Sequence, residues 1–237
     1  MDLHGILFLL IFFVTNTIMM VTGFAGTMMA MPAAILLLGA DEARFILNIT
    51  AILSCGSIAI QQWKYANKQE WKRIIVIMLS GMVVGTALYH IIPLTFLLPV
   101  YGVIIIAVAL KQLFLPETRQ LPTWLCFVIL AAAGIIHGMF LSGGALLVLY
   151  ATMVLHDKSE FRATIAATWA VLEPVFFVLN FKPALWTATN LLLIVCAIPP
   201  LVLSVYLGNY LHKRIGRERF MQLTYALLIL SGLSIIL

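Results

Sequence analysis

Two ionisable side chains, His137 and Glu173, lie deep inside long apolar runs of this 237-residue sequence. A charge in hydrocarbon is costly and usually faces a partner or a water-filled cavity, so these two residues are the first candidates for chemistry. Imidazole changes its charge near neutral pH, which suits His137 as a proton acceptor or a substrate ligand. Glu173 precedes Pro174 in mid-run, where a carboxyl suits proton coupling. The alternative for both is a structural role, with each group hydrogen-bonded inside the helix bundle.

Two clusters of small residues are the second candidate feature. They are Thr22, Gly23, Gly26 and Thr27 in one apolar run, and Ser142, Gly143 and Gly144 in another. Glycine lets a ligand approach the backbone, and a helix that begins at such a cluster presents free N–H groups and the positive end of its dipole. Two such helix ends that face each other would bind an anion without lysine or arginine. The alternative is close packing between helices.

The composition indicates which elements must position these residues. The chain is 63% hydrophobic and only 10% charged, whereas about 25% of the residues in a soluble domain are charged. We therefore expect an all-α integral membrane protein that keeps its first apolar run as a span. The net charge of +5 comes from residues between the runs and does not indicate a nucleic-acid partner. The three cysteines show no metal-site spacing, and we expect neither a metal nor a cofactor.

The apolar runs fall near residues 5–38, 44–62, 73–89, 94–114, 122–155, 163–180, 185–209 and 219–237. Six of them suit one crossing each. The runs 5–38 and 122–155 would each form a straight helix of about 50 Å, against a hydrocarbon core of about 30 Å. These two runs contain the small-residue clusters, so we predict that each run is two limbs joined by a bend.

An internal duplication relates the two halves. With an offset of about 118 residues, Gly26 falls on Gly144, Arg44 on Arg162 and Thr50 on Thr168. Each half also has the same order, a long broken segment followed by three spans. We predict a single membrane domain that contains repeat one, residues 1–117, and repeat two, residues 118–237.

The charges between the runs predict the relative orientation of the repeats. If each long segment crosses once, the fourteen Lys and Arg residues split seven to seven across the membrane. If each segment bends and returns, only Arg44 and Lys182 lie on one side and the other twelve lie opposite. The positive-inside rule favours the second arrangement. It gives two inverted repeats, each with a broken, hairpin helix segment followed by three transmembrane helices, and it places both termini outside the cytoplasm.

The sequence resembles the TauE/SafE sulfite exporter family, also called the toluene sulfonate uptake permease family. Members carry a glycine-rich motif near the end of the first helix, then apolar residues and a proline, and repeat the motif in the second half. Here the first copy runs from Gly23 to Pro32 and the second from Gly138 to Gly144, with Tyr150 in place of the second proline. The resemblance covers nearly the whole chain. It implies transport of sulfite, organosulfonates or related sulfur-containing or carboxylated anions across a bacterial inner membrane.

We therefore expect a secondary transporter, a permease or exporter, for a small anion. The expected mechanism is alternating access, with proton coupling or gating through His137 and Glu173 left open, and the two small-residue clusters are the predicted substrate-binding residues. The expected partners are the anion and the lipid bilayer, and a homodimer is left open. A passive anion channel and a membrane scaffold are the alternatives. An enzyme is not expected, because the sequence has no Ser/His/Asp set, HExxH motif or cysteine nucleophile constellation.

Overall fold

The computed structural model describes residues 3–114, 122–155 and 157–216, together with isolated positions among residues 218–233. Most of the predicted last span, residues 219–237, lies outside the described residues. The loop positions Arg119 and Arg217 and the C-terminus, which entered the prediction of sidedness, also lie outside them.

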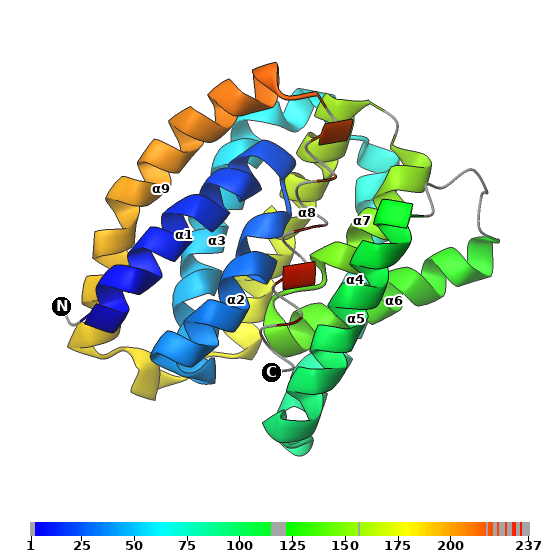
Figure 1. The fold of residues 1–237 in the computed structure, drawn as a ribbon. Helices are drawn as coiled ribbons and strands as arrows, with labels where there is room; N and C mark the ends of the chain where they lie inside the picture. Colours follow the sequence, from blue (N-terminus) through cyan, green and yellow to red (C-terminus); the bar gives the residue numbers. More distant parts are fainter. Residues whose placement is uncertain are drawn as a thin grey trace.

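All the elements of the described ranges are helices (Figure 1). They are α1 (Leu3–Thr22), α2 (Ala25–Leu38), α3 (Ala40–Gln62), α4 (Lys68–Ile91), α5 (Leu94–Phe114), α6 (Thr123–Phe140), α7 (Gly144–Val154), α8 (Lys158–Leu179) and α9 (Ala188–Arg214), with single 3₁₀ turns η1 (Trp63–Tyr65) and η2 (Pro183–Leu185). Six of these helices, α1, α3, α4, α6, α8 and α9, are long and apolar enough to cross a membrane. The chain is therefore a multi-pass membrane protein, and its described part is all-helical.

Polar residues between the apolar runs determine where several helices begin. Asn67 accepts a hydrogen bond from the Glu70 N–H at the start of α4. Asp157 caps α8 in the same way, and Thr187 caps α9. A side-chain oxygen at this position satisfies N–H groups that have no partner within the helix.

Both overlong segments are broken where the sequence predicted. The first break is at Gly23 and Phe24, where Gly23 has φ +86°, and the second is at residues 141–143, where Leu141 has φ 52°. Helix α2 packs back along α1, and a Cβ atom added to Gly26 would lie 2.5 Å from Met19 Cβ. A Cβ atom on Gly143 would lie 2.2 Å from the Ala133 carbonyl oxygen of α6. The second limbs α2 and α7 contain 14 and 11 residues, about 21 and 17 Å, and are too short for a straight crossing.

The two halves pack together through three pairs of helices, each pair with one helix from each half. Helix α1 packs along α9, and α4 packs along α6. The repeat offset exchanges these two pairs, because α1 corresponds to α6 and α4 to α9. Helices α3 and α8, which correspond to each other, pack together at the centre. The pairing fits a duplicated chain, whereas the inverted orientation of the repeats stays a prediction.

Some small residues do serve close packing. Gly81 of α4 and Gly134 of α6 each approach the partner helix so closely that an added Cβ atom would lie 2.3 Å from a carbonyl oxygen. In the corresponding α1–α9 pair, Gly208 meets Met20, and the Ser204 hydroxyl donates to the Phe13 carbonyl at 3.2 Å. Close packing is thus the role of these residues, which lie outside the predicted site.

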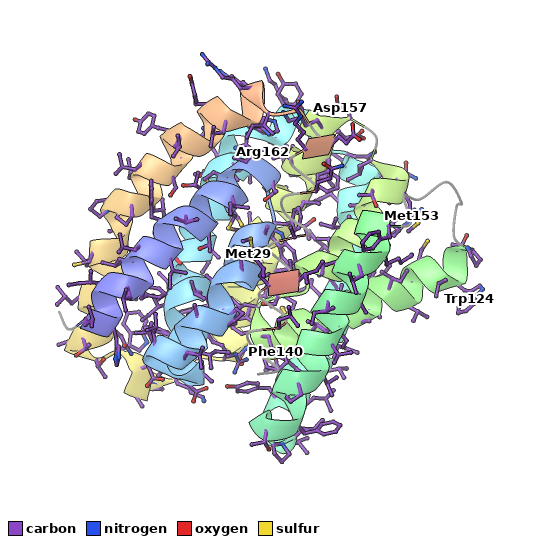
Figure 2. All side chains as sticks on the ribbon, in the orientation of Figure 1. Met29, Trp124, Phe140, Met153, Asp157 and Arg162 are labelled. Atoms are coloured by element: carbon purple, nitrogen blue, oxygen red, sulfur yellow. The ribbon has the colours of Figure 1, made fainter. Side chains whose placement is uncertain are left out.

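The loops place the charges at two ends of the bundle. In Figure 1 the junctions α3–α4 and α7–α8 and the end of α9 lie at the upper end, and the α2–α3 and α8–α9 junctions lie at the lower end. Figure 2 shows Asp157 and Arg162 at the upper end. Between these ends α9 turns exposed Leu192, Val195 and Leu203 outward, as a lipid-facing helix does.

Candidate functional site

The two deep ionisable residues of the sequence meet at the centre of the bundle. His137 of α6 and Glu173 of α8 are each 1% exposed, and His137 Nε2 lies 3.8 Å from Glu173 Oε1. This separation is within ion-pair range but longer than a hydrogen bond. The contact joins residues that are far apart in the sequence, and the two sequence candidates therefore form one cluster.

Asn48 connects a third helix to this cluster. Its Nδ2 donates to Glu173 Oε2 at 2.7 Å and to the Glu173 backbone carbonyl at 3.0 Å. Helices α3, α6 and α8 therefore converge on one carboxyl group.

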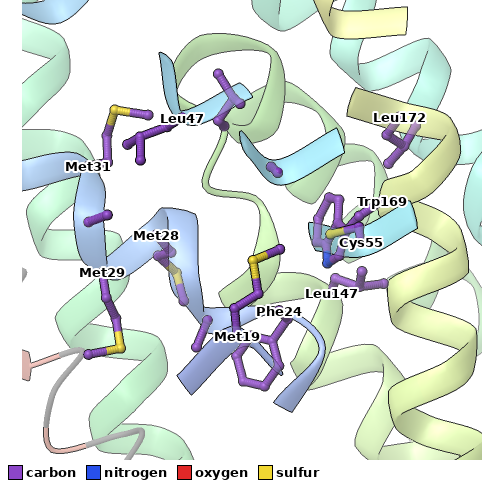
Figure 3. Close-up of a cluster of buried hydrophobic side chains, with 14 of the residues drawn as sticks. Met19, Phe24, Met28, Met29, Met31, Leu47, Cys55, Leu147, Trp169 and Leu172 are labelled. Carbon is purple, nitrogen blue, oxygen red and sulfur yellow. The ribbon is translucent and has the colours of Figure 1, made fainter. Parts of the chain in front are cut away.

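Aromatic rings enclose the imidazole of His137. Its ring centroid lies 4.8 Å from that of Trp169 and 5.8 Å from that of Phe176. Trp169, Glu173 and Phe176 follow one another at helical spacing, which places them on the same face of α8. Figure 3 shows Trp169 beside Cys55 and Leu147, where α8, α3 and α7 come together.

Several polar atoms of this cluster have no hydrogen-bond partner within the described part of the chain. They are both ring nitrogens of His137, Trp169 Nε1 and Asn48 Oδ1. A buried polar atom without a partner costs about 1–3 kcal/mol, and such atoms are rare outside functional sites and water sites. The cluster therefore has hydrogen-bonding capacity that the described residues do not use. A small polar ligand or water molecules would satisfy it.

At the first break, the Thr22 hydroxyl and two backbone N–H groups form hydrogen bonds within the break itself. Thr22 Oγ1 donates to the Ile18 carbonyl at 2.8 Å and accepts from the N–H groups of Phe24 and Ala25 at 3.3 Å. The start of α2 is thus already capped by Thr22. Gly23 lies against Arg162, whose carbonyl oxygen would be 3.0 Å from an added Cβ atom.

Gly26 and Thr27 line a small cavity behind the first break. The cavity has a volume of about 10 Å³, and its polar walls include Thr15, Asn16 and Thr50. Asn16 accepts a hydrogen bond from Ser54 at 2.9 Å, while its Nδ2 has no partner among the described residues. This volume admits about one water molecule.

The second break lies between the first break and the central cluster. Gly143 packs against His137, whose Cβ would be 3.0 Å from a Cβ atom on the glycine. A Cβ atom on Gly144, the first residue of α7, would lie 3.3 Å from the Phe24 carbonyl oxygen and 3.4 Å from its ring. The two breaks are therefore in contact. Ser142, by contrast, donates to the Phe140 carbonyl at 2.8 Å, so its hydroxyl hydrogen is already engaged.

Two buried arginines were not recognised in the sequence as residues of the interior. Arg44 and Arg162 are only 4% and 2% exposed. Arg44 Nη2 donates to the Gly138 carbonyl at 3.1 Å and to Asn180 Oδ1 at 2.9 Å. Each arginine alone resembles a loop residue, because it lies near the start of a helix. Their match under the repeat offset was the signal that could have identified them.

Two further cavities lie in the bundle. One of about 20 Å³ lies between α3 and α8, and its lining includes Asp41, Arg44, Asn48, Asn180 and Lys182. It therefore leads from the lower end of the bundle towards the central cluster.

A larger cavity, of about 220 Å³, lies between α4, α6 and α7, away from the predicted site residues. Tyr150 at its edge donates a hydrogen bond to Glu70. In the described part of the chain, no three His, Cys, Asp or Glu side chains are grouped to hold a metal ion.

Comparisons with known proteins assign the sequence to a family. Neither the curated proteins nor the solved structures give a significant match to the chain. The family model described as sulfite exporter TauE/SafE matches residues 7–235, nearly the entire sequence. The match includes both breaks and all the residues of the central cluster. The chain therefore belongs to the sulfite exporter TauE/SafE family.

Proposed function

We propose that this protein is a secondary transporter of a small anion, either sulfite, an organosulfonate or a related sulfur-containing or carboxylated anion. The observation that carries the proposal is the contact between the two helix breaks, Gly144 against Phe24, beside a buried cluster with unused hydrogen-bonding atoms. Discontinuous helices that meet inside a membrane bundle are typical of substrate sites in secondary transporters. Family membership supports the class of substrate.

The chemistry of the central cluster suits an oxyanion. Trp169 Nε1 is an N–H donor without a partner among the residues that the structure describes, and His137 offers a further N–H whichever tautomer it adopts. Glu173 Oε1 lies 3.8 Å from the imidazole Nε2, and Asn48 donates to the other carboxyl oxygen. Trp169 and His137 are the donors that we propose for the anion, because the hydroxyls of Thr22 and Ser142 already donate to backbone carbonyls.

Proton coupling follows from placing an anion beside Glu173. Two negative charges in a medium of low dielectric constant repel each other strongly. Anion binding is therefore favoured when Glu173 or His137 carries a proton, and the two binding events are linked thermodynamically. This linkage would make the protein a proton-coupled anion transporter.

The transport mechanism we propose is alternating access between inverted repeats. The cavity beside the first break, about 10 Å³, and the cavity between α3 and α8, about 20 Å³, are too small for a substrate, which supports a closed state. The interlocked pairs α1–α9 and α4–α6 would then move relative to the central pair α3–α8. The excess of basic residues at the upper end supports its placement in the cytoplasm of a bacterium, with both termini on the opposite side of the inner membrane.

A thermal-shift screen of the purified protein tests the proposal. The ligands are sulfite, thiosulfate, organosulfonates and carboxylates, and a neutral sulfone of matched size is the control. A ligand that binds the folded state at 100 times its Kd stabilises it by about 2.7 kcal/mol, so we expect at least one anion to raise Tm above the sulfone control. If no anion raises the Tm of a folded sample beyond the sulfone, the central cluster is not an anion site.

A further inference from the structure

We propose that Arg44 and Arg162 form two outer anion-binding sites, one on each side of the central cluster. Each site would hold the transported oxyanion before or after it passes the central cluster. The inference rests on the proposed function, because it concerns the path of the same substrate. It assigns binding roles to two residues outside the helix breaks and the His137–Glu173 cluster.

The first argument is the charge balance around Arg44. The nearest carboxylate oxygen is Asp41 Oδ1, 4.0 Å from Arg44 Nη1. The other Asp41 oxygen is bound by Lys182 Nζ at 2.7 Å. One carboxylate thus serves two cations, and this group of three side chains has a net charge of +1. A buried cation with only a shared counter-ion is costly in a membrane protein and indicates a functional role.

Arg162 has still less compensation. Among the described residues, no carboxylate oxygen forms an ion pair with it within 4.0 Å. Its Nη2 donates to the neutral Asn209 Oδ1 at 2.7 Å. An anion that entered this site would supply the missing negative charge.

The second argument is the unused hydrogen-bonding capacity of both guanidinium groups. The Nε–H of Arg44 and that of Arg162 are buried without a partner among the described residues. Arg44 Nη2 donates to the neutral oxygens of Gly138 and Asn180, and Arg162 Nη2 donates to the neutral oxygen of Asn209. The Arg44 guanidinium also stacks on the Tyr89 ring, 3.5 Å from its centroid, which leaves the edge of the fork as the face for an anion. Guanidinium presents five donors in a planar fork that matches two oxygens of an oxyanion. Both side chains therefore remain able to bind a sulfite or sulfonate group.

The third argument is the position of the two arginines relative to the breaks. Arg44 binds the Gly138 carbonyl of α6, the first limb of the second hairpin. Arg162 lies against Gly23, in the break of the first hairpin. Each arginine thus belongs to one half and contacts the broken segment of the other half. The two arginines match under the repeat offset. Helix α3, which carries Arg44 near its start, begins at the lower end of the bundle in Figure 1, and Arg162 lies towards the upper end in Figure 2.

The cavity beside Arg44 connects the outer site with the centre. Arg44 and Asn48 line the same space of about 20 Å³ between α3 and α8. Asn48 in turn donates to Glu173. An anion released by Arg44 would therefore meet the central cluster next.

The test measures sulfite flux into proteoliposomes for Arg44→Gln and Arg162→Gln. Loss of a charge-assisted, bidentate contact should raise KM about tenfold while Vmax stays within about twofold. Arg44→Lys and Arg162→Lys keep the charge and should restore much of the affinity. The matched control is Arg73→Gln, since Arg73 is a partly exposed arginine that is paired with Glu70 at 2.9 Å and should leave KM unchanged.

The outcomes separate this inference from the proposed function. If the unaltered protein shows no saturable anion flux, the proposed function fails. If it does show saturable flux and both Gln variants keep its KM, or lose Vmax alone, only the outer sites are refuted. If the Gln variants do not fold, Lys182→Gln decides, because this side chain is partly exposed. A KM increase of about threefold supports the site at Arg44, and an unchanged KM contradicts it.

Discussion

Gly144→Val is expected to reduce anion flux on the order of 100-fold while leaving folded protein in the membrane. A Cβ atom at this position would lie 3.3 Å from the Phe24 carbonyl oxygen, and the two methyl groups of valine need more room still. The second break would be pushed away from the first at the point where the two meet. The measurement is uptake of labelled sulfite by proteoliposomes, normalised to the amount of folded protein.

The matched control is Gly56→Val on α3, because nothing lies within 4 Å of a Cβ atom there. Gly143→Val is a different experiment. The Ala133 carbonyl oxygen would be only 2.2 Å from the new Cβ atom, so we expect that variant to lose folded protein as well as flux. Normal flux in Gly144→Val would remove the contact between the breaks from the transport path.

Glu173→Gln is expected to uncouple anion movement from the proton gradient. Glutamine keeps the size of the side chain and the acceptor for Asn48 Nδ2, which bonds the carboxyl at 2.7 Å. It cannot release a proton. A gradient of one pH unit drives about tenfold accumulation when one proton moves with each anion. The unaltered protein should reach this value with a labelled sulfonate at a clamped membrane potential, and the variant should equilibrate the sulfonate without accumulating it.

Glu70→Gln is the control for this substitution. Glu70 binds Arg73 and Tyr150 near the start of α4, away from the central cluster. Proteoliposomes with Glu70→Gln should accumulate the sulfonate as the unaltered protein does. If Glu173→Gln also accumulates it tenfold, the transported proton does not pass through Glu173.

The helix breaks could be predicted because their causes are local. A run of more than thirty apolar residues is too long for the bilayer, and glycine is the residue at which a backbone turns most readily. The exact turn also depended on Leu141, which adopts a left-handed conformation that leucine rarely takes. No pattern in the sequence predicts a left-handed backbone at Leu141, because the packing of α6 and α7 imposes it.

The composition of the site could be predicted only in part. His137 and Glu173 stood out as charges in apolar sequence, but their contact depends on how α6 and α8 cross. Arg44 was missed for the opposite reason, because it lies near the start of a helix and its burial comes from α6 and α8 packing over it. For Thr22 and Ser142, a nearby backbone carbonyl competes with a ligand for the hydroxyl, and the local bond forms in this structure.

A counterflow experiment tests the central claim most directly. Proteoliposomes loaded with unlabelled sulfite are diluted into a trace of labelled sulfite, and the label inside is followed with time. A carrier that exposes one closed site to each side in turn predicts a transient accumulation of label above equilibrium, abolished by Gly144→Val. Label that only relaxes towards equilibrium, at a rate proportional to concentration, would show an open channel and contradict the account.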